Sequence, residues 1–111
     1  MLISKDYQQM LSSKGVPLDG LGIREVGLTR DDALRAVGFL EGESIPIFGG
    51  DVYFRRGSKI ETAYANWYSD PVPGEDRCEF LSGSWKKARQ YIKDFPERDG
   101  VDPLFVLVVG R

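Results

Sequence analysis

Hydrophobic side chains recur along much of the chain at the three- and four-residue spacing of an amphipathic helix. This spacing predicts helices over residues 4–14, 29–41 and 76–95. In the third segment the apolar face extends over about five turns. It consists of Cys78, Leu81, Trp85, Ala88, Ile92 and Phe95. Thr29 can cap the second helix, because its hydroxyl can accept a hydrogen bond from the backbone N–H of Asp32.

Between these segments the hydrophobic period changes to two, which is typical of β-strands. The alternation over residues 45–64 predicts a hairpin, with its turn at residues 55–58. Apolar segments at 23–28 and 104–109 predict two further strands. Gly49-Gly50 interrupts the first arm of the hairpin, which indicates a bulge or a close approach of another group to the backbone.

After the first helix, the predicted order is strand, helix, strand, strand, helix, strand. Right-handed crossovers then give an α+β fold, a ferredoxin-like split βαβ sandwich with an antiparallel sheet and an extra N-terminal helix. This arrangement has four strands, with the two later helices on one face. A more irregular α+β arrangement of the same elements is the alternative. Because 111 residues suffice for one hydrophobic core, we expect residues 1–111 to form a single domain.

The composition excludes several classes of enzyme and binding protein. With no histidine and one cysteine, the chain lacks the residues of the common zinc sites and of Ser-His or Cys-His catalytic pairs. Its net charge of −2 is far from the strongly basic footprint of a nucleic-acid-binding protein. We therefore expect no metal, no cofactor and no direct binding of nucleic acid.

The chain also shows no sign of export or membrane insertion. Residues 1–10 have neither the basic start nor the apolar core of a signal peptide. The longest apolar run, residues 104–109, is far shorter than the roughly 20 residues that a helix needs to cross a bilayer. We expect a cytoplasmic protein with no membrane partner, in which Cys78 is a free thiol.

The segments that resemble catalytic motifs are incomplete. Ser84-Trp85-Lys86-Lys87 matches the S-x-x-K motif of penicillin-recognising serine enzymes, but the partner motifs of those enzymes are missing. The glycines at 20–22 and 49–50 complete neither of the common phosphate-binding patterns. We interpret the first segment as an exposed helix face and the glycines as turns.

Aromatic and acidic side chains gather in the hairpin and in the loop that follows it. Strand alternation places Asp51 and Tyr53 on one face of the strand and their apolar neighbours Val52 and Phe54 on the other. Trp67 and Tyr68 are adjacent, so in an extended strand at least one of the two rings reaches the surface. Aromatic anchors beside carboxylates favour a protein interface. The expected partner-binding residues are Asp51, Tyr53, Glu61, Trp67, Tyr68 and Asp70. The alternative is that the two rings fill the core and the carboxylates are only solvated.

Four blocks of sequence carry a resemblance to a known family. They are S-K-G-V-P-L-D-G-L-G at 13–22, I-P-I-F-G-G-D-V-Y at 45–53, N-W-Y-S-D at 66–70 and S-W-K-K-A-R at 84–89. In these blocks the chain resembles the immunity protein 40 family of bacterial polymorphic toxin systems. In this order the four blocks span most of the chain.

The resemblance implies a non-catalytic cytoplasmic antidote that protects the producing cell by binding a cognate protein toxin. An acidic, aromatic surface would suit a basic toxin such as a nuclease. Two other functions are compatible with the residues. One is a small regulatory or small-molecule-binding domain without a toxin partner, because a split βαβ fold does not determine function. The other is a small hydrolase with paired carboxylates, although no spacing singles out such a pair.

Overall fold

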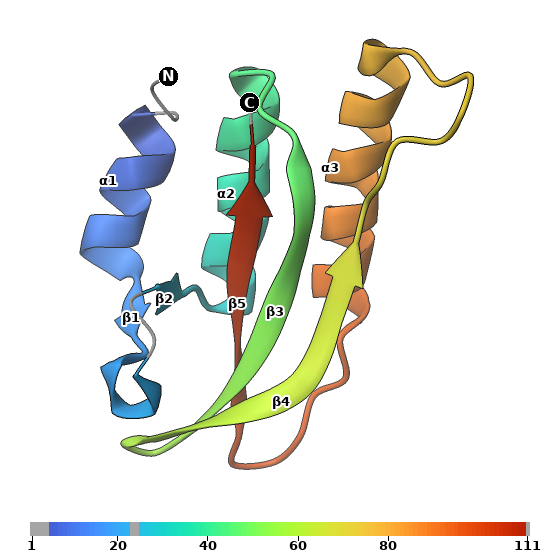
Figure 1. Cartoon of the computed structure of the whole chain (residues 1–111). Helices are drawn as coiled ribbons and strands as arrows, with labels where there is room; N and C mark the ends of the chain where they lie inside the picture. Colours follow the sequence, from blue (N-terminus) through green and yellow to red (C-terminus); the bar gives the residue numbers. More distant parts are fainter. Residues whose placement is uncertain (1–4, 23–24, 111) are drawn as a thin grey trace.

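The computed structural model describes residues 5–22 and 25–110, and Figure 1 shows its helices and strands. The predicted strand at 23–28 lies partly outside the described residues. The helices are α1 (Lys5–Lys14), α2 (Arg30–Gly42) and α3 (Arg77–Asp94), with a 3-10 turn η1 (Asp19–Leu21). The strands are β1 (Val16–Pro17), β2 (Val26–Gly27), β3 (Ile47–Arg56), β4 (Lys59–Tyr68) and β5 (Asp102–Val109).

The predicted helices are confirmed to within about one residue at each end, because local signals define where they begin and end. The Thr29 hydroxyl accepts from the Asp32 N–H at 3.4 Å and caps α2, as predicted. Asp76 and Glu79 form a reciprocal capping box at the start of α3. Half-buried Trp85 in α3 donates through Nε1 to the carbonyl oxygen of Ile45 at 2.8 Å.

The main sheet is antiparallel with the strand order β4-β3-β5, and a separate small sheet pairs β1 with β2. Leu28, just after β2, forms an isolated antiparallel bridge to Phe105. The α+β class is therefore confirmed, whereas the ferredoxin-like detail is not. Both strand–helix–strand connections skip one strand, as in a split βαβ unit. However, the central strand is the first arm of the hairpin, and the second arm, β4, lies at the edge.

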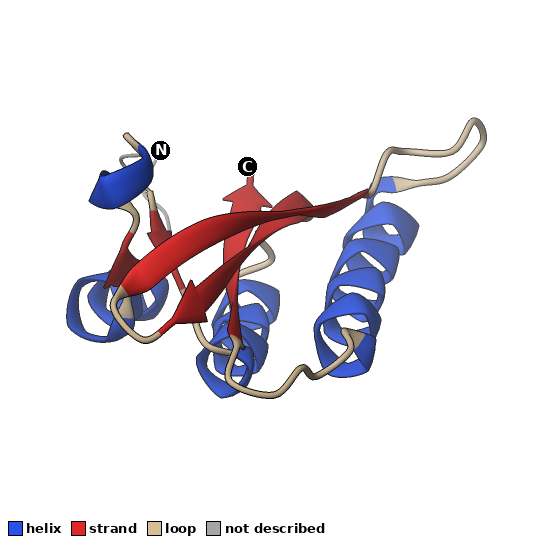
Figure 2. Cartoon of the chain, turned by 90° about the horizontal axis from the view of Figure 1, so that it is seen from below, coloured by secondary structure: helices blue, strands red, loops and turns tan. Residues whose placement is uncertain are grey.

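Helices α2 and α3 cover the same face of this sheet, and Figure 2 shows the opposite face free of helices over much of β3 and β4. The main core lies between the helices and the sheet and includes Val37, Leu40, Ile92, Phe105 and Trp67. On the opposite face a smaller cluster of Leu18, Leu104 and Val106 is partly covered by Val16, Tyr53 and Ile60. The helix-free face is thus closed beside β1 and open elsewhere.

The hairpin is longer than predicted and contains two irregularities. The β3–β5 register shifts between Ile47 and Gly49, which confirms the bulge expected at the paired glycines. A Cβ on Gly50 would lie 2.3 Å from Cη2 of Trp67, so the glycine also permits the close approach of that ring. A second shift was not predicted. Val52 pairs with Ala65 and Tyr53 with Thr62, which leaves two extra residues in β4.

Candidate functional site

Asp51 and Tyr53 lie on the helix-free face of the sheet. They flank Val52, which is 1% exposed and belongs to the core under the helices. Strand alternation therefore directs both side chains to the opposite face. Tyr53 packs at the border of the small cluster around Leu104. These two of the six predicted residues are brought together as expected.

Trp67 and Tyr68 point in opposite directions. Trp67 is only 5% exposed and stacks on Tyr91 of α3, with ring centroids 4.6 Å apart. Tyr68 is 66% exposed, so the expectation that at least one ring reaches the surface is confirmed. Trp67 therefore agrees with the alternative interpretation, in which its ring fills the core. It lies beneath the proposed surface and is not part of it.

Glu61 and Asp70 are both separated from the Asp51–Tyr53 pair. Glu61 is opposite Phe54 in the β3–β4 register, and Phe54 packs on Phe95 of α3, so Glu61 lies on the helix side. Its Oε1 forms an ion pair with Nε of Arg56 at 3.8 Å. Asp70 is exposed in the loop after β4, beyond the end of the sheet.

A hollow of about 270 Å³ opens beside Asp51 on the helix-free face. It is lined by Asp51, Val52, Tyr53, Thr62, Tyr64, Ala65 and Asn66. Thr62, Tyr64 and Asn66 are not among the six binding residues predicted from the sequence. Asn66 is directly opposite Asp51, but this pairing depends on the irregular register of the hairpin. Only the position of Asn66 within the N-W-Y-S-D block could have drawn attention to it.

Tyr64 has an unusual backbone and an unusual exposure. Its φ is +54°, a left-handed conformation that costs most residues other than glycine about 1 kcal/mol or more. Its backbone N–H donates to Oγ1 of Thr62 at 3.2 Å, which helps to hold the two-residue insertion in place. The ring is 90% exposed, so packing within the fold does not compensate for the strain. Such strain is often found where a surface binds a ligand.

Two carboxylates act on the hydroxyl of Tyr53, which lines the hollow. Burial, then the charges of Asp51 and Glu25, raise the pKa of the Tyr53 hydroxyl above its ordinary value. The ion pairs found among residues 5–22 and 25–110 include neither Asp51 nor Glu25. Both carboxylates are therefore available to a cationic partner.

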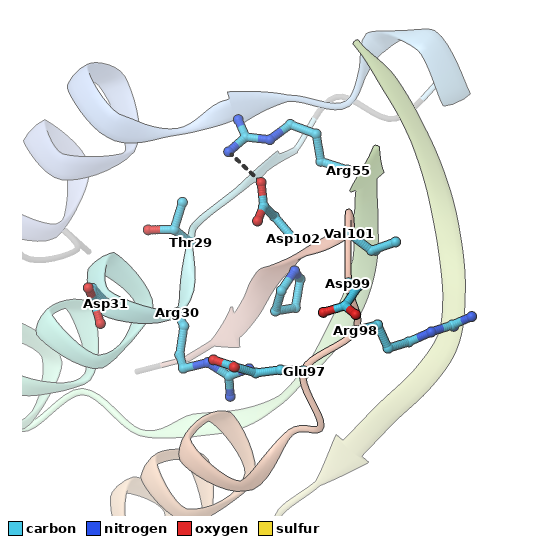
Figure 3. A pocket seen from close by; sticks show the side chains of 10 residues that line it. Thr29, Arg30, Asp31, Arg55, Glu97, Arg98, Asp99, Val101 and Asp102 are labelled. Atoms are coloured by element: carbon cyan, nitrogen blue, oxygen red, sulfur yellow. Dashed lines mark ion pairs between the residues drawn. The ribbon is translucent and has the colours of Figure 1, made fainter. Parts of the chain in front are cut away.

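A larger hollow of about 500 Å³ lies between the start of α2 and the loop before β5 (Figure 3). Arg30 donates from Nη1 to the carbonyl oxygens of Ile92 and Lys93 at the end of α3, at 2.6 and 3.2 Å. Arg55 and Asp102 face each other in Figure 3 and form an ion pair at 3.6 Å. Arg98 points away from that pair and lies 5.2 Å from the ring centroid of Phe54. These arginines already make contacts within the fold, so this hollow is a weaker candidate for a binding site than the one beside Asp51.

Neither a metal cluster nor a membrane-spanning helix is present among the described residues. The described residues contain no group of three or more His, Cys, Asp or Glu side chains that could hold a metal ion. Among the helices of the described residues, none combines the length and the apolar character needed to cross a bilayer.

These features define a small α+β protein whose best candidate site is an open sheet face with exposed tyrosines and with a carboxylate, Asp51, that has no ion pair within the part of the chain that the structure describes. The family model of immunity protein 40 matches residues 17–109, which is most of the chain. The chain therefore belongs to the immunity protein 40 family, and the resemblance seen in the sequence blocks is confirmed. A search of curated proteins and a search of solved structures found no match to the chain.

Proposed function

We propose that this chain is an immunity protein that neutralises a cognate bacterial toxin by binding it, without catalysing a reaction. Membership of the family supports the immunity function. The observation that carries the location of the interface is the open sheet face around the Asp51 hollow, with Tyr64 90% exposed and Tyr68 66% exposed. Tyrosines of this kind are favoured anchors in protein interfaces.

The charge of this face suggests the kind of toxin. Asp51 on this face has no ion-pair partner among the described residues, and neither has Glu25, whose charge acts on the Tyr53 hydroxyl. Asp70 is exposed in the loop two residues after Tyr68. Carboxylates at an interface attract a basic partner and speed its association. A nuclease has such a surface, because it must bind phosphates. We propose a basic toxin, with a nuclease as the first candidate, and the cytoplasm as the place of neutralisation.

The direct test is to purify the protein with the toxin encoded beside its gene and to measure their affinity and association rate. We compare the double variant Asp51→Lys/Asp70→Lys with Glu43→Lys/Asp99→Lys, which makes the same charge change at exposed positions outside the proposed face. The first variant should bind more slowly and more weakly, most clearly at low salt, and should fail to protect cells. The second should behave much more like the wild type.

Equal effects of the two variants would refute the location of the interface. The exposed surface of α3 would then be tested next, because Tyr91, Phe95 and Pro96 line an apolar hollow of about 420 Å³ there. If the wild-type protein neither binds the toxin nor protects cells from it, the proposed function itself is wrong.

A further inference from the structure

We infer that the hollow beside Asp51 receives one arginine side chain, which the toxin presents. This inference rests on the proposed function and gives the chemistry of the contact. The pocket is built by Asp51 and Tyr53 of β3 and by Thr62, Tyr64 and Asn66 of β4.

The size of the hollow fits a side chain better than a free metabolite. Its volume of about 270 Å³ lies below the roughly 300–1,000 Å³ of pockets that enclose drug-sized ligands. It opens on a sheet face that carries one further exposed tyrosine, Tyr68, so an inserted side chain would belong to a wider protein contact.

The lining groups match a guanidinium. The Asp51 carboxylate can accept two parallel N–H bonds, a geometry that arginine offers and lysine does not. The rings of Tyr53 and Tyr64 offer aromatic faces for a planar cation. The Asn66 side-chain oxygen can accept a further hydrogen bond. Arginine is therefore the expected occupant.

The chain does not supply this cation from its own described residues. Arg55 and Arg56 are the arginines of the same strand, and they pair with Asp102 and Glu61. Asp51 has no ion pair within the described ranges. Burial is the main reason why the pKa of Tyr53 is raised, and the charges of Asp51 and Glu25, which act on its hydroxyl, raise it further.

The strained Tyr64 is an independent sign of a binding role. Its left-handed backbone turns a large ring into solvent, where the fold gains nothing from it. A bound guanidinium would stack on this ring and recover part of the cost. The two-residue insertion that creates this conformation also forms one wall of the hollow.

The first experiment needs no toxin. Backbone amide NMR spectra are recorded while N-acetyl-arginine methylamide is added, and the neutral citrulline analogue serves as the control probe. We expect selective, saturable shifts around Asp51, Tyr53 and residues 62–66 with the arginine probe only. These shifts should disappear in Asp51→Asn and persist in Asp70→Asn, which removes a charge outside the hollow.

The second experiment is a double-mutant cycle with the toxin. Each surface arginine of the toxin is changed to glutamine and combined with Asp51→Asn. We expect one arginine whose effect on Kd is coupled to Asp51 by about tenfold or more, as close charge pairs at interfaces show. The same arginine should show no coupling to Asp70.

The outcomes separate this inference from the proposed function. Equal shifts with both probes, or no shifts with either, would overturn the arginine site. So would tight toxin binding with no arginine coupled to Asp51. Selective arginine shifts in a protein that fails to bind the toxin would support the arginine pocket and refute the proposed function alone.

Discussion

The indole of Trp67 stacks on the phenol ring of Tyr91, with centroids 4.6 Å apart and an angle of 27° between the ring planes. This contact joins the edge strand β4 to α3 and directs Trp67 away from the helix-free face. Because neighbouring strand residues alternate, it also places Tyr68 in solvent, where it is 66% exposed. The buried contact between Trp67 and Tyr91 thus determines that Tyr68 points to the proposed surface.

Truncation should affect Trp67 and Tyr68 very differently. Trp67→Ala removes a large core side chain and should lower the free energy of unfolding by about 3–5 kcal/mol. Tyr68→Ala should change it by no more than about 0.5 kcal/mol, because the ring is exposed. Urea unfolding followed by circular dichroism measures both values. Equal losses would contradict the assignment of the two rings to opposite sides.

Two glycines should respond in opposite ways to alanine. A Cβ at Gly50 would meet the Trp67 ring at 2.3 Å and the carbonyl oxygen of Val106 at 2.7 Å, so Gly50→Ala should destabilise the fold. Gly83 lies inside α3 with open space around its Cβ position. Gly83→Ala should raise the melting temperature, with a gain of about 0.5–1 kcal/mol. A melt in which Gly50→Ala is also stabilised would show that the ring does not lie on this glycine.

Arg30 should contribute to stability through the end of α3. Its Nη1 donates to the last-turn carbonyl oxygens of Ile92 and Lys93, which lack partners within the helix. Arg30→Met should lower the free energy of unfolding by about 1.5–3 kcal/mol, the usual range for hydrogen bonds to a charged group. Arg35→Met is the control, because Arg35 is 63% exposed and pairs with Asp32 at 3.7 Å. Its effect should stay within about 0.5 kcal/mol.

Tyr7 should make the fold sensitive to alkali. Burial, and then the charge of Glu25, raise the pKa of Tyr7 from 10.0 to about 12. The folded state therefore keeps the phenol proton to a higher pH than the unfolded state. Its contribution is fully present below pH 10 and is lost as the pH rises towards 12, with a total of about 2–3 kcal/mol. Urea unfolding over this range should show a shallower decline for Tyr7→Phe than for the wild type. Tyr68→Phe, at an exposed ring, should keep the wild-type slope.

Tyr64→Gly should separate stability from binding. Glycine adopts a positive φ without strain, so the variant should be more stable by up to about 1 kcal/mol. The same change removes an aromatic wall of the Asp51 hollow and should weaken toxin binding. A thermal melt and a titration with the toxin measure the two effects. A variant that binds as tightly as the wild type would exclude Tyr64 from the interface.

The strand order shows where prediction from the sequence stops. The ferredoxin-like arrangement and the observed order β4-β3-β5 both join strands through helices that skip one strand. The two differ in which hairpin arm occupies the centre of the sheet. That choice depends on long-range contacts of β5 with β3, such as Val52 opposite Phe105, and periodicity along one strand contains no information about them.

For the same reason, only part of the candidate surface could be predicted from the sequence. Alternation correctly placed Asp51 and Tyr53 on the face opposite Val52, because it depends only on adjacent residues. The two-residue insertion at Ala63 and Tyr64 shifts the pairing of β4, and no turn or breaker residue marks it in the sequence. The hollow between Thr62 and Asn66 therefore escaped prediction. Glu61 pairs with Phe54 on the turn side of the insertion, so its location on the helix side depends on the exact turn residues of the hairpin and not on the insertion.

The sequence by itself determined the helices, the Thr29 cap, the hairpin and the family, because these depend on residues a few positions apart or on blocks of sequence that resemble the family. Only the tertiary structure decided that Trp67 packs on Tyr91, that β4 lies at the edge, and that Tyr64 is held in a left-handed conformation beside Asp51. These features arise from packing and register between segments distant in sequence. Their energies are set by which surfaces meet, and local patterns do not specify that.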